Sequence, residues 1–223
     1  MFEGFSQEAV DFLWGITLHN ERSWFLAHKE EYSTLLDAPL KALGHEVFDA
    51  LEPDLPPRSM HLHVCRIYRD ARRLHGRGPY KEHLWFQIER PHERFEGVPC
   101  LYFEIAPNYF SYGCGYWNAG ASTMAKLRHR IDTSPAPLEK ITRKLRRSRF
   151  TLGGEEYKRP KGDAGTLLNP WYNRKNILIS YEDDPDGVLF TPQLKDELVD
   201  GFRLLMPAFD YLDSLSADPV PET

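Results

Sequence analysis

The sequence has few features of a secreted or membrane-bound protein. Its 223 residues include only three cysteines, Cys65, Cys100 and Cys114, an odd number with wide spacing and no Cys-x-x-Cys pair. Reduced, mostly buried thiols are the simplest interpretation. No apolar run approaches the roughly 18 residues that cross a bilayer, and the first residues lack a basic segment followed by an apolar one. We therefore expect a cytoplasmic protein with no secretory signal and no membrane partner.

The sequence also lacks the common catalytic fingerprints. Gly-x-Ser-x-Gly, His-Glu-x-x-His, the P-loop and the dinucleotide motif are all missing, which excludes several enzyme classes in their usual forms. Catalytic residues and cofactors therefore stay unassigned. His61 and His63 share one strand face, a spacing that chelates metals, but no third ligand is indicated nearby and no metal site is predicted. Glu104 lies between apolar neighbours, so it is either an acid or base of raised pKa or the partner of an arginine.

What the sequence does contain is enough apolar material for a sizeable core. Hydrophobic residues make up 41% of the chain and aromatic residues 13%. Prolines and glycines are spread along the chain, with no repeat, low-complexity segment or strong linker. We expect one domain over residues 1–216 and a frayed tail over residues 217–223.

Helical periodicity is found at both ends of the chain. A first helix is expected from Ser6 to about Asn20, and a second pattern continues to Leu51, with Pro39 interrupting or restarting it. The segments "ASTMAKLRHRI" and "PLEKITRKLRRSRF" predict two more helices. The last helix is the clearest, because apolar residues recur every three or four positions from Leu194 to Leu212, and Pro207 is expected to kink it.

The middle of the chain predicts strands. "HLHVCRIYR", "HLWFQIER", "CLYFEIAP" and "YFSYGCGYW" are short, rich in β-branched and aromatic residues, and separated by turn signals. No crossover helix fits between them, so antiparallel pairing is favoured. "NILISYED" predicts a further strand, and the short "GVLF" is a candidate to pair nearby. The fold class expected is α+β, a mainly antiparallel sheet of about five strands packed by N-terminal and C-terminal helices.

The most unusual segment is "RIYRDARRLHGRGPYKEH", residues 66–83, which gathers positive charge in a chain of formal net charge −5. Arginine matches a phosphate or carboxylate bidentately, and lysine adds a compact charge. One interpretation is an anion site. The other is an internal network in which carboxylates pair the arginines. Lys161 in the "RPKG" loop is a further candidate, either a ligand contact or a solvated turn. The candidate ligand-binding residues are Arg66, Arg69, Asp70, Arg72, Tyr80, Lys81 and Lys161.

Several stretches resemble DUF2461, a family of uncharacterised proteins. In "HNERSWF", Asn20, Trp24 and Phe25 match the family's Asn-x-x-x-Trp-Phe. The basic segment is similar to the family pattern Arg-Ile-x-Arg-Asp-x-Arg-Phe-Ser-x-Asp-Lys-x-Pro-Tyr-Lys at Arg66, Ile67, Arg69, Asp70, Arg72, Pro79, Tyr80 and Lys81. Arg73 and Leu74 replace the Phe-Ser pair, and Gly76 and Arg77 replace the Asp-Lys pair. The resemblance covers most of the chain and implies where important residues lie, without implying an activity.

Two functional hypotheses follow. In the first, the protein binds an anionic small molecule, either as a binding protein or as an enzyme. Arg66, Arg69 and Lys81 hold the anion, Asp70 orients the arginines, Tyr80 donates a hydrogen bond and Lys161 closes from its loop. The second is a non-enzymatic module that meets a nucleic acid or a protein, and it is the less favoured. It would use the basic helix around Lys140–Arg149 and the aromatics Tyr102, Phe110, Tyr112 and Trp117. The oligomeric state is not indicated.

Overall fold

A curved six-stranded sheet forms the centre of the computed structural model, which describes residues 1–55, 60–70, 72, 74, 76–91 and 97–221. The strand order is β1-β2-β3-β4-β6-β5, and every pairing is antiparallel. Only the last two positions depart from chain order. The strands are β1 (His61–Val64), β2 (Leu84–Glu89), β3 (Cys100–Ile105), β4 (Phe110–Gly115), β5 (Thr151–Gly153) and β6 (Leu178–Asp183).

Helices precede the sheet in the chain and follow its fourth strand. Those before it are α1 (Gln7–Leu18), α2 (Arg22–Ala27), α3 (Lys29–Tyr32) and α4 (Ala38–Leu51). Those after β4 are α5 (Ala121–Thr133), α6 (Ala136–Leu145), α7 (Gly165–Tyr172) and α8 (Leu194–Ser214). Pro39 lies in the first turn of α4, directly after a π-helical turn. A proline is tolerated there because the first-turn N–H groups have no partner inside the helix.

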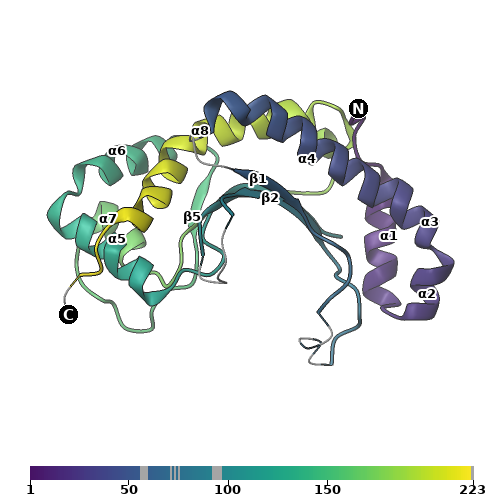
Figure 1. Cartoon of the computed structure of the whole chain (residues 1–223), viewed down its shortest axis with the longest axis horizontal. Coiled ribbons are helices and arrows are strands. Elements are labelled where there is room, and N and C mark those ends of the chain that lie inside the picture. The colour runs from purple at the N-terminus through teal and green to yellow at the C-terminus, as the bar shows by residue number, and fades with distance from the viewer. Residues whose placement is uncertain (56–59, 71, 73, 75, 92–96, 222–223) are drawn as a thin grey trace.

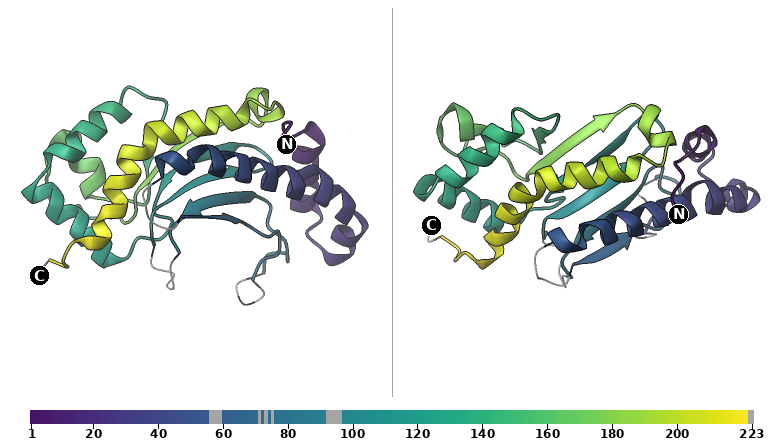
Figure 2. Two further views of the ribbon diagram at one scale, coloured as in Figure 1. Left: turned by 45° about the horizontal axis from the view of Figure 1, so that its top comes forward. Right: turned by 90° about the horizontal axis from the view of Figure 1, so that it is seen from above.

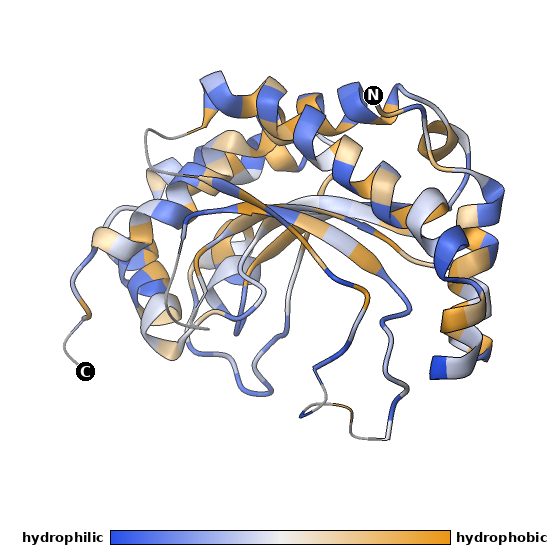
Figure 3. Ribbon diagram, turned by 45° about the vertical axis from the view of Figure 1, so that its right-hand side comes forward, coloured by the Kyte–Doolittle hydropathy of each residue, from blue (hydrophilic) through white to orange (hydrophobic). Residues whose placement is uncertain are grey.

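The long helices α4 and α8 cover the convex face of the sheet (Figures 1 and 2). Apolar and polar residues alternate along the strands, and side chains two residues apart point to the same face. The apolar side chains therefore form one face of the sheet, against which α4 and α8 pack. Phe86 and Phe103 are fully buried on this side, and Phe202 and Phe209 of α8 are buried with them. Figure 3 shows apolar bands on the helices and strands and polar residues along the connecting loops. Burial of this apolar surface is the main stabilising contribution to the layer.

The concave face of the sheet lies open between two helical ends (Figure 1). Helices α1, α2 and α3 stand at one end of the molecule, and α5, α6 and α7 gather at the other. The described parts of the connection between β1 and β2, which carry most of the basic segment, lie on the side of α1–α3. The polar positions of the strands alternate with the buried ones and therefore face away from α4 and α8.

The expected α+β class and the antiparallel sheet are confirmed, with three differences in detail. The sheet has six strands rather than about five, because the three-residue strand β5 is too short to produce a pattern. "GVLF" forms a 3₁₀ helix (Gly187–Phe190) that buries Leu189, so its expected pairing is wrong. Sequence patterning did not predict α7, which contains an internal proline.

Beyond α8, a 3₁₀ turn (Leu215–Ala217) leads to Asp218, which accepts hydrogen bonds from Arg130 of α5. The division into one domain over residues 1–216 and a tail stays a prediction. Among the described residues, no helix is both long enough and apolar enough to traverse a bilayer.

Candidate functional site

The antiparallel register aligns polar side chains from separate strands across the concave face. Trp85 of β2 lies opposite Glu104 of β3, Glu104 opposite Ser111 of β4, and Ser111 opposite Glu182 of β6. Directly opposed residues have Cβ atoms about 5 Å apart and point to the same face. A transverse row is thereby assembled from four strands that span about 100 positions of sequence.

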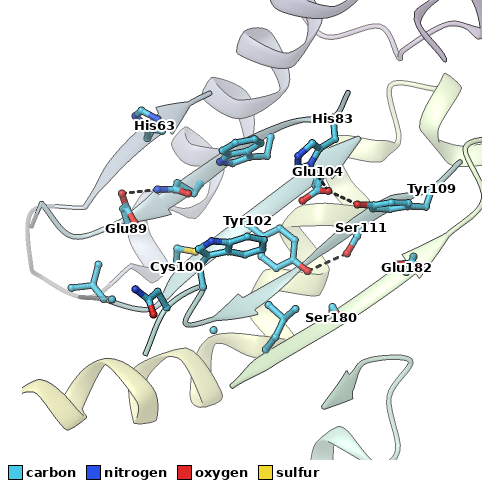
Figure 4. Close-up of a pocket in the computed structure, with 18 residues that line it drawn as sticks. His63, His83, Glu89, Cys100, Tyr102, Glu104, Tyr109, Ser111, Ser180 and Glu182 are labelled. Atoms are coloured by element: carbon cyan, nitrogen blue, oxygen red, sulfur yellow. Dashed lines mark hydrogen bonds and ion pairs between the residues drawn. The ribbon is translucent and has the colours of Figure 1, made fainter. Parts of the chain in front are cut away.

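These rows form the floor of a cavity of about 520 Å³. Ligand cavities in proteins commonly measure about 300–1,000 Å³. Figure 4 shows the polar side chains projecting from the sheet into this space. The lining residues are His63, His83, Trp85, Gln87, Glu89, Gly97, Val98, Cys100, Tyr102, Glu104, Tyr109, Ser111, Gly115, Trp117, Asn118, Leu178, Ser180 and Glu182.

Glu104 is the centre of the most connected polar group in the cavity. His83 Nδ1 lies 2.8 Å from its Oε1 atom, and the hydroxyl of Tyr109 donates to the same oxygen (Figure 4). Burial acts to raise the pKa of Glu104, but the hydrogen bonds from His83 and Tyr109 outweigh it and hold the pKa below its ordinary value. Of the two interpretations from sequence, a raised-pKa acid is therefore wrong, and the partner is a histidine rather than an arginine.

Other polar groups on this face are also paired. Gln87 Nε2 donates to Glu89 Oε1 at 2.7 Å, and the Tyr102 hydroxyl lies 3.1 Å from Ser111 Oγ. Burial raises the pKa of Tyr102 to about 12, so this phenol stays neutral at physiological pH. The floor therefore offers fixed hydrogen-bonding groups rather than mobile ones.

The charge of the described lining is negative. Three carboxylates, Glu89, Glu104 and Glu182, face the cavity, and its described lining includes no lysine or arginine. Lys81 lies beside the lining, with its ammonium 5.0 Å from the centre of the Trp85 ring. An anion on the floor would be repelled, whereas a hydroxyl or ammonium group would find acceptors.

Two glycines allow β4 to approach β6 closely beneath this cavity. A Cβ atom on Gly113 would collide with the backbone carbonyl of Ile179, and one on Gly115 with that of Ile177. This close approach of the two strands is the physical reason for glycine at both positions.

Within the basic segment, Arg69 is held by internal partners. Its Nε donates to the carbonyl of Tyr80 at 2.6 Å, and its Nη2 lies 2.9 Å from Glu82 Oε2. The side chain is only 11% exposed. Arg69 is therefore paired with internal groups, which is the second of the two interpretations of the basic segment.

Asp70, Arg72 and Tyr80 also make local contacts. Asp70 forms a bidentate pair with Arg72, with nitrogen–oxygen distances of 3.0 and 2.8 Å. Arg72 is largely exposed. The ring of Tyr80 is buried and stacks on Phe25 with centroids 4.2 Å apart, so its side chain belongs to the core.

Lys81 lies beside the cavity, and its ammonium contacts the backbone of Arg66. The Lys81 ammonium donates to the carbonyls of Arg66 and Tyr68 and sits over Trp85, a cavity residue. Burial lowers the pKa of Lys81, and the charges of Arg66 and Arg69 lower it further. The Arg66 side chain is exposed and makes no hydrogen bond to any described residue. We call Arg66 and Lys81 the basic rim.

Lys161 lies in a different environment. Its backbone N–H donates to Asn173 at the end of α7, and its ammonium lies 4.8 Å from the ring centre of Tyr157. Of the seven candidate ligand-binding residues, none is among the described residues that line the cavity. Whether any of the seven binds a ligand stays a prediction.

The alternative interaction surface is only partly exposed. Lys140, Arg143 and Arg147 of the α6 region are exposed, as the sequence suggested. Phe110 and Tyr112, by contrast, are buried. A nucleic-acid or protein partner stays a prediction, and it would have to bind without these two aromatic side chains.

The two histidines of "HLH" are not gathered into a metal site. His61 Nε2 lies 4.0 Å from Glu89 Oε1, and His63 lines the cavity. Within the described ranges, no group of three or more histidine, cysteine, aspartate or glutamate side chains is arranged to hold a metal ion.

Sequence reasoning missed most of the cavity. His83, just before β2, and Trp85 and Gln87 within it alternate with buried apolar residues, which is a detectable period-two signal. Read alone, however, such polar positions look like an ordinary solvated strand face. These positions become a site because the register places polar side chains of β3, β4 and β6 beside them.

Comparison with known proteins gives a family without an activity. A family model described as "Conserved hypothetical protein (DUF2461)" matches residues 8–211. No curated protein matches the chain. The matched range includes the basic rim and every lining residue of the cavity. The chain therefore belongs to the DUF2461 family.

Proposed function

We propose that the protein binds a small polar molecule in the cavity on the concave face of its sheet. The observation that carries the proposal is the cavity itself, about 520 Å³ in volume, with aromatic walls and a floor of fixed hydrogen-bonding groups. A largely apolar hollow with a few convergent polar groups is the usual form of a small-molecule site.

The lining favours a ligand rich in hydrogen-bond donors. Carboxylates accept hydrogen bonds and donate none, so Glu104 and Glu182 match hydroxyl or ammonium groups. The indoles of Trp85 and the 77% exposed Trp117 offer flat apolar faces for the body of the ligand. Hydroxylated or amino-bearing small molecules fit both features.

An anionic group of the ligand, as expected from the sequence, would find cations at the basic rim. Arg66 has an exposed guanidinium, which can accept a phosphate or carboxylate bidentately. Lys81 connects this arginine to the cavity through its contacts with the Arg66 carbonyl and the Trp85 ring. The ligand class we propose therefore combines hydroxyl or amino groups over the floor with one anionic group at the rim.

A thermal-shift screen tests this class directly. The probes are amino acids, polyols, amino sugars and phosphorylated amino sugars, each added to the intact chain. At about 100 times its Kd, a ligand stabilises by about 2.7 kcal/mol, which raises the Tm by about 5–10 °C for a domain of this size.

Variants divide the two parts of the site. Glu182→Gln should weaken every binder, and Arg66→Gln should weaken only the anionic ones. Arg143→Gln is the matched control, since Arg143 is exposed on α6 and paired with Glu139. The proposal is wrong if no probe class shifts the Tm and native mass spectrometry finds no bound small molecule after purification.

A further inference from the structure

The pair formed by His83 and Glu104 has the geometry of a positioned proton acceptor. His83 immediately precedes β2 and lies on the same face as Trp85, whose register partner is Glu104. The two residues are therefore diagonal neighbours across β2 and β3, within reach of long side chains. Tyr109 approaches Glu104 from the opposite side, where the chain turns between β3 and β4.

The carboxylate fixes which ring nitrogen of His83 carries the proton. An ionised carboxylate only accepts hydrogen bonds, so the 2.8 Å contact requires Nδ1 to be the donor. In the neutral ring the lone pair then resides on Nε2. This second nitrogen makes no hydrogen bond to any described residue, and it is not among the buried polar atoms that lack a partner.

The surroundings of the ring keep it in place without occupying Nε2. His83 lies 5.3 Å from the Trp85 ring and is one-third exposed. The charged and titratable groups around the His83–Glu104 pair are Glu104 from β3, Tyr109 from the β3–β4 turn, Lys81 over Trp85, and Glu182 from β6. The charge of Glu182 acts on Tyr109. Of these, only Glu104 contacts the imidazole through a hydrogen bond.

We propose that His83 is a general base of the cavity, with Glu104 and Tyr109 as positioning residues. The inference rests on the proposed function, because the proton comes from a hydroxyl or ammonium group of the bound molecule. Its O–H or N–H bond breaks, the electron pair stays on the ligand atom, and the proton forms a new bond to Nε2. The imidazolium so formed is stabilised by the Glu104 carboxylate, as in carboxylate–histidine pairs generally.

Nitrogen NMR of the histidine-labelled chain tests the fixed tautomer. The chain has nine histidines, and His83→Gln identifies the signal that belongs to His83. In the unaltered protein we expect neutral His83 to carry its proton on Nδ1. A proton on Nε2 would overturn the proposal, and this measurement does not depend on the folding of a Glu104 variant.

Acylation by diethyl pyrocarbonate tests the reactivity of the lone pair, with each histidine followed by mass spectrometry. His83 should react readily, and Glu104→Gln should slow it about tenfold, the weight of one charge-assisted hydrogen bond. His63 is the matched control, since it lines the same cavity away from Glu104 and should keep its rate. A purely structural Glu104 would leave the rate at His83 unchanged, which would refute its positioning role.

The two proposals fail in different ways. If no probe binds in the thermal-shift screen but His83 carries its proton on Nδ1 and is acylated rapidly, the proposed ligand class is wrong and the His83–Glu104 pair stands. Probe binding with a slow or wrongly protonated His83 would overturn the general base and leave a binding site. Protection of His83 from acylation by a probe that raises the Tm would support both.

Discussion

Replacing Asn20 by alanine should loosen the basic segment from the N-terminal helices. The side chain of Asn20, between α1 and α2, pairs with the backbone of Tyr80 as a neighbouring strand would. Its Nδ2 donates to the Tyr80 carbonyl at 3.0 Å, and its Oδ1 accepts from the Tyr80 N–H at 2.9 Å. This contact bridges 60 positions of sequence and fixes the residue that precedes Lys81.

The magnitude follows from which atoms are left without partners. In Asn20→Ala, the Tyr80 carbonyl keeps the hydrogen bond from Arg69, but the Tyr80 N–H loses its acceptor. A lost hydrogen bond costs about 1 kcal/mol net, and a buried donor left unpaired costs about 1–3 kcal/mol. We expect the free energy of unfolding to fall by about 2–3 kcal/mol.

Urea unfolding followed by tryptophan fluorescence measures this change. With an m-value near 2–3 kcal/mol/M, the midpoint should fall by about 1 M urea. Gln7→Ala is the control, because it removes an exposed side-chain hydrogen bond to Asp11 on α1. A surface substitution of that kind should alter stability by less than about 0.5 kcal/mol.

A double-mutant cycle with Arg69→Met sharpens the test. Asn20 and Arg69 donate to the same carbonyl, so removing both leaves that oxygen without either donor. The combined loss should exceed the sum of the single losses by at least about 0.5 kcal/mol. A loss below about 0.5 kcal/mol in Asn20→Ala, or strict additivity in the cycle, would show that this pairing does not hold the segment.

Three further predictions concern other parts of the molecule. Burial raises the pKa of Cys65 to about 11, that of Cys100 to about 12 and that of Cys114 further still. A thiol reagent at pH 8 should therefore label none of these three cysteines until the chain is unfolded. Rapid labelling of the native protein would contradict this burial. Glu104 has a native pKa below its ordinary value of 4.5, so its stabilising contribution is present above that pH and is lost as the pH falls through the native pKa. Glu104→Gln should therefore flatten the acid limb of the stability curve in chemical unfolding, and an unchanged limb would count against the pairing. Gly113→Ala should destabilise by about 1–3 kcal/mol in the same assay, because the new methyl group meets the backbone of β6; a neutral result would mean that the two strands separate easily.

The basic segment has a clear structural role and a narrower functional one. Arg69 binds Tyr80 and Glu82, and Asn20 secures the same turn, so part of the motif holds the β1–β2 connection against the helices. His83 lines the cavity, and Lys81, which contacts the Arg66 carbonyl, lies over the Trp85 ring at its edge. Such a division is physically reasonable, because a site built on a loop needs its own anchoring contacts.

The sequence by itself determined the class of the fold. Alternating apolar residues required strands in the middle of the chain, and the three-to-four residue period required helices at both ends. No crossover helix fits between the four strands of the middle, which left antiparallel pairing as the simple topology, and all five pairings are antiparallel. Elements with weak patterns, such as β5 and α7, were missed because their lengths and glycine or proline content carry little periodic signal.

Tertiary structure alone decided where the site lies. In the sequence, the arginines of residues 66–72 are conspicuous because they are adjacent, yet Arg69 and Arg72 pair with Glu82 and Asp70. Trp85, Glu104 and Glu182 are far apart in the sequence and come together through register. The local sequence pattern determines which face of the sheet each residue points to. Only the pairing of the strands determines which residues lie next to one another on that face. The chemistry of a site depends on these neighbours, so it was decided by the tertiary structure.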